Sequence, residues 1–315
     1  MPKPLWKISG GSTGSEMTLQ EFVTTRFGTK LWMSLGRWLP PWAGYRVAHL
    51  AVTIVSRRRN SSLYRILYEN QAAIHDAQMP AEELHAAVRR VLEHVGRTAY
   101  DLMYYLAGGE ARLRDAMTFD DQVWANVQRA MATGRGVMIC GCHMSNFNLG
   151  FLCLSQRAET PQIQVLVPPT MTGGFRIMHE LRSSPKFHET PISVASLREA
   201  MQRLAGGGMV ATGVDWPLAA AADERITFFG RPARLPTGYI RLAINAGAVL
   251  LPVAFRWDAG RGYHMLTVPH LELELTGDRT RDIEHNARRV LAVLERWIAE
   301  RPEQWLMYYR VWPTS

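Results

Sequence analysis

The chain has 315 residues, of which 47% are hydrophobic and 20% are charged, a composition typical of globular proteins and unlike that of disordered or fibrous ones. Its net charge of +8 favours an anionic partner: nucleic acid, an acidic membrane surface, or a phosphorylated or CoA-like ligand. Cys140, Cys142 and Cys153 have no partners at zinc-ligand spacing elsewhere, which argues against a disulfide scaffold and a zinc site, so no metal is expected.

Residues 1–16 are rich in Gly, Ser, Pro and Lys and are predicted to form a flexible N-terminus. They contain no compact apolar core of the kind found in secretory signals, so we expect no signal peptide. The longest apolar candidate, 31–56, is interrupted by Arg37, Pro40, Pro41 and Arg46, which argues against a transmembrane helix.

Residues 17–132 are predicted to be a helical N-terminal region. In its first part, 18–59, aromatic side chains alternate with arginines, Pro40 and Pro41 break the helices, and Arg57–Arg59 closes the segment. Tryptophan and arginine on amphipathic helices are typical of a membrane interface. The alternative is a helical hairpin packed on the core with a solvated basic end, but the net charge favours membrane contact.

Helical spacing of apolar residues continues from Leu84 to Leu102, and Pro80 followed by Ala-Glu-Glu is a plausible helix start. From residue 133 the pattern changes to short apolar runs that alternate with helices. The predicted strands are Gly136–Cys140, Ile163–Val167, Pro191–Val194, Met209–Thr212 and Val249–Phe255, with Tyr263–Val268 as an edge strand. The predicted helices are 146–156, 173–183, 195–206, 236–246 and Asp282–Glu300.

This alternation predicts an α/β fold: a central, mostly parallel (mixed) sheet flanked by helices, with a helical N-terminal membrane-docking region. We expect the α/β core, 133–315, to form one integrated domain with the helical region 17–132.

His143 is the most informative residue because it follows the first predicted strand at its carboxyl end, where open α/β sheets place their ligands. Ser145 is expected to cap the next helix, and Asn148 lies in its first turn, from which it can face the imidazole. A histidine with a polar partner at such a position is a candidate general base.

Other polar side chains follow the later strands and are expected at the same sheet edge. Arg176 follows the second strand, Asp215 follows Ala211–Val214, and Arg234 lies in the loop 226–238. Each residue alone also has a structural explanation: the histidine in a core, Arg176 on a solvated helix face, and Asp215 in a turn before a proline.

Together these segments resemble the lysophospholipid acyltransferase superfamily, and within it the lipid A late acyltransferase branch that includes the phosphatidylinositol mannoside acyltransferases. The resemblance extends over about residues 20–312. Its most specific segments are 141–148, 227–230 and 235–238, and further matches are 215–218, 251–253 and 302–312.

The resemblance implies transfer of a fatty acyl group from a thioester, on acyl carrier protein (ACP) or coenzyme A (CoA), to a hydroxyl of a membrane glycolipid or lysolipid. The thioester is a cosubstrate, and no tightly bound cofactor is implied. The family signature is a histidine, four residues, and then Asp or Glu. His143 is then the base, and Asn148 occupies the acidic position.

The resemblance also implies a substrate-binding set. Arg176 and Arg234 are the candidates for binding phosphate groups of the donor or acceptor, and Asp215, Phe229 and Gly230 complete the set. It further implies a peripheral location on the cytoplasmic face of a bacterial inner membrane.

Asn148 departs from the family pattern because an amide cannot offer a full negative charge to an imidazolium, although its carbonyl can accept a hydrogen bond. Three explanations stay open. Asn148 is an engineered change that traps a substrate complex; or the enzyme is slow or uses another carboxylate, such as Asp215; or the chain is a catalytically silent member that binds ACP or lipid.

Two further alternatives are disfavoured. Cys142 as a nucleophile beside His143 conflicts with the opposite directions of neighbouring side chains on a strand. Binding of nucleic acid is suggested by the charge alone, since no recognition motif accompanies the short arginine cluster at 57–59.

Overall fold

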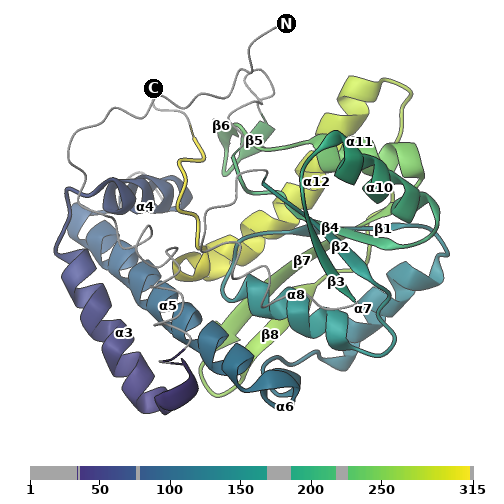
Figure 1. Cartoon of the computed structure of the whole chain (residues 1–315). Helices are drawn as coiled ribbons and strands as arrows, with labels where there is room; N and C mark the ends of the chain where they lie inside the picture. Colours follow the sequence, from purple (N-terminus) through teal and green to yellow (C-terminus); the bar gives the residue numbers. More distant parts are fainter. Residues whose placement is uncertain (1–33, 35, 76–78, 169–185, 218–225, 313–315) are drawn as a thin grey trace, which may run out of the picture.

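The computed structural model describes residues 34, 36–75, 79–168, 186–217 and 226–312. Its centre is a six-stranded sheet of order β3-β2-β4-β1-β7-β8, as Figure 1 shows. The strands are β1 (Val137–Gly141), β2 (Ile163–Val167), β3 (Phe187–Pro191), β4 (Met209–Gly213), β7 (Val249–Asp258) and β8 (Gly262–Thr267). Five strands are parallel, and β8 pairs antiparallel with β7 at the edge, so the predicted mixed α/β sheet is confirmed.

β1 is buried on both sides, and its residues alternate between two halves of the core. Met138 and Cys140 belong to the half that contains α10, α11 and α12, whereas Val137 and Ile139 belong to the half that contains α7 and α8. The helices of the α/β core are α8 (Phe147–Gln156), α10 (Val194–Ala205), α11 (Gly238–Ala246) and α12 (Arg279–Glu300), followed by the 3-10 turn η1 (Pro302–Gln304).

The described part of the region before the sheet, within residues 34–132, is mostly helical, as predicted. Its described helices are α3 (Pro41–Ser56), α4 (Ser62–Ile74), α5 (Ala81–Ala107), α6 (Gly109–Arg114) and α7 (Asp121–Ala132). Pro41 is the first residue of α3 and Pro80 precedes α5, where the missing proline N–H and its fixed φ are tolerated. In Figure 1, α3 and α5 run side by side next to the sheet.

A buried carboxylate ties these two helices to the sheet. The hydroxyls of Tyr45 in α3 and Tyr263 in β8 both donate to Asp101 in α5, at 2.7 and 2.5 Å. Within the described residues, none of the helices combines the length and the apolar character that crossing a bilayer requires.

Two sequence predictions are wrong in detail, and a third is untested. The strand expected at Pro191–Val194 lies earlier, at Phe187–Pro191, because Ser193 caps α10 with a capping box. The loop expected at 226–238 contains a hairpin of β5 (Ile226–Phe228) and β6 (Arg231–Ala233). The helix expected at 173–183 lies outside the described residues.

Candidate active site

The sheet register brings His143 and Asp215 together. β1 and β4 are parallel neighbours in which Gly141 pairs with Gly213. His143 and Asp215 each lie two residues beyond this pair, at the carboxyl ends of the two strands. Two side chains that follow parallel neighbours at the same offset lie close to one another, so the predicted meeting of polar groups at this edge is confirmed for this pair.

Asp215 holds His143 through both of its carboxylate oxygens. Oδ1 lies 2.6 Å from Nδ1 of the imidazole, and Oδ2 accepts the backbone N–H of His143 at 2.8 Å. Oδ2 also accepts the indole N–H of Trp305 at 2.8 Å. The side chain of Asp215 is 0% exposed. The carboxylate therefore fixes the ring and the backbone of His143 from behind, rather than facing a surface that a substrate can reach.

The surroundings of Asp215 favour its ionised form. Burial by itself raises the pKa of this carboxyl, but the charge of His143 and the hydrogen bonds from His143 and Trp305 outweigh it, so the pKa lies below its ordinary value. An ionised carboxylate can only accept hydrogen bonds, so the proton between the two groups belongs to Nδ1 of His143. The Nε2 atom of the neutral ring then carries a free lone pair.

The loop that carries His143 has an unusual backbone. Ser145 has a φ of +51°, in the left-handed region that non-glycine residues rarely adopt. Consequently Asn146, and not Ser145, occupies the cap position of α8, which corrects the predicted cap. The N–H of Ser145 donates to the carbonyl of Gln304 at 2.7 Å, and its hydroxyl lies 3.0 Å from Nε2 of His94 in α5.

The imidazole is accessible on its other side, with 16% of the His143 side chain exposed. Its neighbours there are aromatic: the centroid of the Phe147 ring lies 4.7 Å away and that of Trp216 lies 5.1 Å away. Trp216 in turn packs on Tyr309, with centroids 4.2 Å apart. The segments 169–185 and 218–225, which follow β2 and β4, lie outside the described residues.

Close packing of the sheet also restricts the ring. A Cβ atom on Gly213 would lie 2.5 Å from Cε1 of His143. Real Cβ atoms do not approach this closely, so a side chain at position 213 forces the imidazole to move. The absence of a side chain at this end of β4 is therefore a requirement of the observed ring position.

Asn148 is the second residue of α8 and is half-buried. Its predicted hydrogen bond to His143 stays a prediction, while Nδ1 of His143 contacts Asp215. Arg176 lies outside the described residues, so its expected role also stays a prediction.

Phe229 and Gly230 form the turn of the β5–β6 hairpin, with φ values of +49° and +68°. Positive φ at both positions is the mark of the tight hairpin turn whose twist matches that of the strands. The backbone N–H of Phe229 donates to Glu295 Oε1 at 2.6 Å, which holds the turn on α12. Arg234 follows the hairpin and is half-buried, and its Nε has no hydrogen-bond partner among the described residues.

The hairpin is connected through aromatic rings to the pair of His143 and Asp215, which we call the dyad. Phe228 lies 6.0 Å from Trp305 and 5.8 Å from Trp312, measured between centroids, and the indole of Trp312 donates to the Phe228 carbonyl at 3.0 Å. Because Trp305 donates to Asp215, the hairpin packs against a residue that holds the carboxylate in place.

Other chemistry at this edge is disfavoured. Cys142 is fully buried, and burial together with the charge of Asp215 raises the pKa of its thiol well above the ordinary value, which suppresses the nucleophilic thiolate. Within the described part of the chain, no three His, Cys, Asp or Glu side chains are grouped so that they could hold a metal ion.

Sequence reasoning missed the functional neighbours Trp305, Gly213, Phe147 and Trp216. For Trp305 the available signal was its place in the tryptophan-rich C-terminal segment 302–312, but nothing local to that segment points to a carboxylate at residue 215. For Gly213 the signal was a glycine at the end of a predicted strand, which indicates close approach of another group.

Comparison with known proteins identifies related sequences. A family model described as bacterial lipid A biosynthesis acyltransferase matches residues 15–314. The phosphatidylinositol mannoside acyltransferase of Mycobacterium tuberculosis (strain ATCC 25618 / H37Rv) is 27% identical over 192 residues, 59% of this chain and 58% of the relative. That of Mycolicibacterium smegmatis is 27% identical over 197 residues, 61% of this chain and 60% of the relative.

The resemblance inferred from the sequence motifs is thereby confirmed. The matched segment spans 58–60% of the length of these mycobacterial relatives.

Proposed function

Because the chain belongs to the bacterial lipid A biosynthesis acyltransferase family, we propose that it transfers a fatty acyl group from an acyl thioester to a hydroxyl of a glycolipid or lysolipid. The observation that carries the proposal is the hydrogen-bonded pair of His143 and a buried, ionised Asp215 at the carboxyl edge of the sheet. The names of the mycobacterial relatives favour a glycolipid acceptor.

In this mechanism Nε2 of His143 takes the proton of the acceptor hydroxyl as the oxygen attacks the thioester carbonyl carbon. The new ester bond forms, the carbon–sulfur bond breaks, and the departing thiolate receives the proton from Nε2. Direct attack requires no covalent enzyme intermediate. The donor is acyl-ACP or acyl-CoA, and it acts as a cosubstrate, so the proposal needs no tightly bound cofactor.

Asp215 acts through His143. Its Oδ1 keeps the proton on Nδ1 and so leaves Nε2 free to act as the base, and its negative charge stabilises the imidazolium that forms during the reaction. The second oxygen holds the backbone of the same residue, so ring and main chain are positioned together. This geometry favours the explanation in which a carboxylate other than residue 148 supports the base.

The substrate-binding roles of Arg176, Arg234, Phe229 and Gly230 belong to the same proposal. A half-buried Arg234, whose Nε has no hydrogen-bond partner within the part of the chain that the structure describes, suits a phosphate of the donor or acceptor.

We also propose that the protein attaches peripherally to the cytoplasmic face of a bacterial inner membrane through α3. Five large apolar side chains are exposed there or just before it, and we call them the α3 stripe: Trp38, Trp42, Val47, Leu50 and Ile54. Trp42 and Leu50 are 65% and 63% exposed. Exposed apolar residues gathered on one helix are typical of a surface that inserts into a membrane interface.

The alternative of a catalytically silent member rested on the amide at residue 148. The carboxylate that His143 contacts comes from Asp215, so the reason for expecting silence loses weight. Binding of ACP or lipid without turnover stays an outcome that the following experiment can produce.

The test is acyl transfer by the full chain and by His143→Ala, with long-chain acyl-CoA and acyl-ACP as donors and a mixture of glycolipids and lysolipids in vesicles. We expect transfer by the wild type and a loss of at least about 10³-fold in the variant, because the base is removed. Circular dichroism checks that the variant is folded. Normal turnover by the folded variant would refute the assignment of the base, and donor binding without transfer by the wild type would support the silent alternative.

A further inference from the structure

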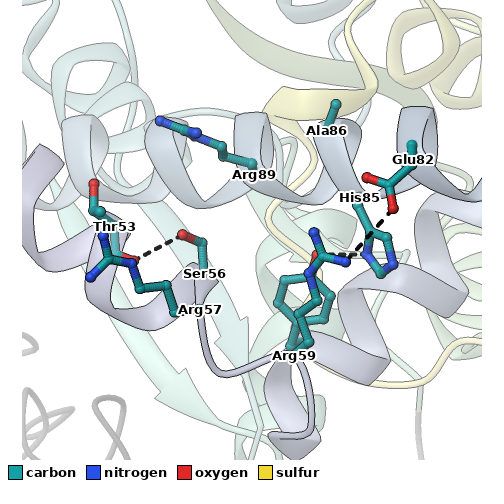
Figure 2. A pocket seen from close by; sticks show the side chains of 9 residues that line it. Thr53, Ser56, Arg57, Arg59, Glu82, His85, Ala86 and Arg89 are labelled. Atoms are coloured by element: carbon teal, nitrogen blue, oxygen red, sulfur yellow. Dashed lines mark hydrogen bonds and ion pairs between the residues drawn. The ribbon is translucent and has the colours of Figure 1, made fainter.

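A cavity of about 410 Å³ lies between the end of α3 and the first turns of α5, and it is separate from the His143 site. Figure 2 shows its lining. Arg57 lies beside Thr53 and Ser56, Arg59 lies beside Glu82 and His85, and Arg89 comes from α5. Three guanidinium groups and one carboxylate give this lining a net positive charge.

One arginine of this cavity, Arg89, forms an ion pair with Glu93 at 3.0 Å, whereas Arg57 and Arg59 have no close ion pair among the described residues. Arg59 and Glu82 are 3.9 Å apart at their nearest N and O atoms, and both side chains are largely exposed. Arg89 pairs with Glu93 in its own helix, which does not line the cavity. Among the described residues, Arg57 forms no ion pair. The cavity therefore offers guanidinium donors to an anion from more than one side, which is the arrangement that phosphate recognition uses.

The position of the cavity next to the α3 stripe indicates the source of such an anion. Thr53 and Arg57, which line the cavity, flank Ile54, the last residue of the α3 stripe. From Trp42 to Ile54 the stripe extends roughly 18 Å along the helix axis, at the rise of an α-helix. When this stripe lies in the plane of a membrane interface, the cavity lies at the end of the stripe and beside it, at the depth of the lipid headgroups.

Two arginines on α3 and just before it also lie next to the exposed tryptophan rings of the α3 stripe. The guanidinium of Arg46 lies 5.4 Å from the centroid of the Trp42 ring, and that of Arg37 lies 5.7 Å from the Trp38 ring. These pairs place a cation directly beside an inserting aromatic ring, where it meets anionic headgroups. Cations thus lie beside the first part of the apolar stripe, and the cavity adds Arg57, Arg59 and Arg89 at its far end.

We propose that the cavity lined by Arg57, Arg59 and Arg89 binds the phosphate of an anionic phospholipid headgroup whose acyl chains lie in the membrane beside the α3 stripe. This inference rests on the proposed attachment through α3, but it does not depend on the chemistry at His143. It makes attachment selective for anionic lipid and fixes the orientation of α3 on the surface.

The test measures binding of the full chain to vesicles of phosphatidylcholine and to mixed vesicles of phosphatidylcholine and phosphatidylglycerol. The cavity variant is Arg57→Gln with Arg59→Gln. Its matched control is Arg58→Gln with Arg65→Gln, which removes the same charge from exposed neighbours that do not line the cavity. Thermal unfolding checks that both variants are folded.

We expect the cavity variant to lose about tenfold or more in affinity for the mixed vesicles, and the control about threefold or less. On phosphatidylcholine vesicles the three proteins should bind alike. Equal losses in the cavity variant and the control would overturn the inference, because attraction would then follow overall charge alone.

Two further arms separate the possible failures. The stripe variant Leu50→Ser with Ile54→Ser should lose binding to both kinds of vesicle. If the wild type binds neither kind, the proposed attachment through α3 itself is contradicted. A calorimetric titration with soluble glycerol phosphate completes the test. Tight binding that the cavity variant loses would assign the cavity to a soluble phosphate ester and overturn its assignment to lipid.

Discussion

The amide of Asn148 and the carboxylate of Asp215 differ in what they can do for an imidazole. Both can accept a hydrogen bond, but only the carboxylate carries a charge that stabilises the imidazolium and lacks a donor that could favour the wrong tautomer. The carboxylate is also fully buried and receives three hydrogen bonds, so it cannot rotate away from the ring.

The first residue-scale prediction concerns Gly213. Replacing it by Ala places a Cβ atom 2.5 Å from Cε1 of His143 and displaces the ring from Asp215. We expect kcat for acyl transfer to fall by about 10²-fold, as for small misplacements of reacting groups. The matched control is Gly206→Ala, whose added Cβ makes only ordinary contacts at the end of α10. Unchanged kcat in Gly213→Ala would show that the ring position is not critical.

At this scale, sequence reasoning identified both His143 and Asp215 but paired them only within one of three open explanations for Asn148. His143 and Asp215 each follow a predicted strand, and this alone places them at the carboxyl edge of a parallel sheet. Pairing them requires knowing that β4 lies next to β1, and the strand order depends on tertiary packing rather than on local sequence. The attractive local partner, Asn148, was therefore given the role for which Asp215 has the geometry.

Among the elements, the segment after α12 is the one that completes the site. The N–H of Leu306 donates to the carbonyl of His143 at 2.8 Å, and Gln304 and Trp305 hold Ser145 and Asp215. Elements that are separated by more than 80 residues in sequence thus meet around one loop. Helix α5 closes the other side through His94, and Asn146 donates to the Thr98 carbonyl at 3.1 Å.

The contact of α5 with the loop gives a prediction on pH. Burial, and secondarily the charge of Arg97, lowers the pKa of His94 to about 3. In the unfolded chain the imidazole takes up its proton below about pH 6.5, whereas the folded chain stays neutral there to about pH 3. The unfolded state therefore binds more protons in this window, and the free energy of unfolding falls as the pH falls through it.

The expected slope from this one group is up to about 1.4 kcal/mol per pH unit between about pH 6 and pH 4. His75 and His264 have lowered pKa values and act in the same direction, so the measurement must compare variants. Urea unfolding of the wild type and of His94→Gln at several pH values isolates the contribution of His94 to the pH dependence of the free energy of unfolding. Identical pH slopes for the two proteins would contradict it.

Sequence patterns predicted the buried strands well and the marginal ones poorly. Ile163–Val167 was predicted with its observed bounds because a strand buried on both faces is mostly apolar, and only Gln164 interrupts the apolar run here. β3 lies at the sheet edge and alternates between buried and exposed residues, so the neighbouring apolar run at 191–194 gave the stronger signal. The β5–β6 hairpin has strands of three residues and a Phe-Gly turn, too short for either pattern.

On the scale of the whole molecule, the net charge of +8 and the α3 stripe suit one task, which is attachment to an anionic surface. The sequence predicted an aromatic and basic N-terminal segment, and in its described part the large exposed apolar side chains lie on α3 or, for Trp38, just before it. Which of these residues are exposed was not predictable, because burial of Gly44, Ala48 and Val52 depends on the packing of α3 on α5.

Attachment through α3 predicts that catalysis depends on how the acceptor is presented. With an acceptor lipid in vesicles, Leu50→Ser combined with Ile54→Ser should lower transfer by about tenfold or more, because apolar area that anchors the protein is lost. With a soluble short-chain acceptor, the same variant should work as well as the wild type. Equal loss with both acceptors would mean that the substitutions damage the fold or the site instead.

The proposed mechanism depends on the carboxylate that supports His143, so the decisive measurement is thioester consumption by Asp215→Asn, compared with Asn148→Ala and Asn148→Asp, each checked for folding. We expect Asp215→Asn to lose about 10³- to 10⁴-fold in kcat, as an Asp to Asn change does in the serine-protease triad. We expect each change at residue 148 to alter the activation free energy by less than about 1.4 kcal/mol, so kcat of both variants should stay within about tenfold of the wild type. Near-normal turnover by folded Asp215→Asn, or a gain of orders of magnitude in Asn148→Asp, would contradict the pairing of His143 with Asp215.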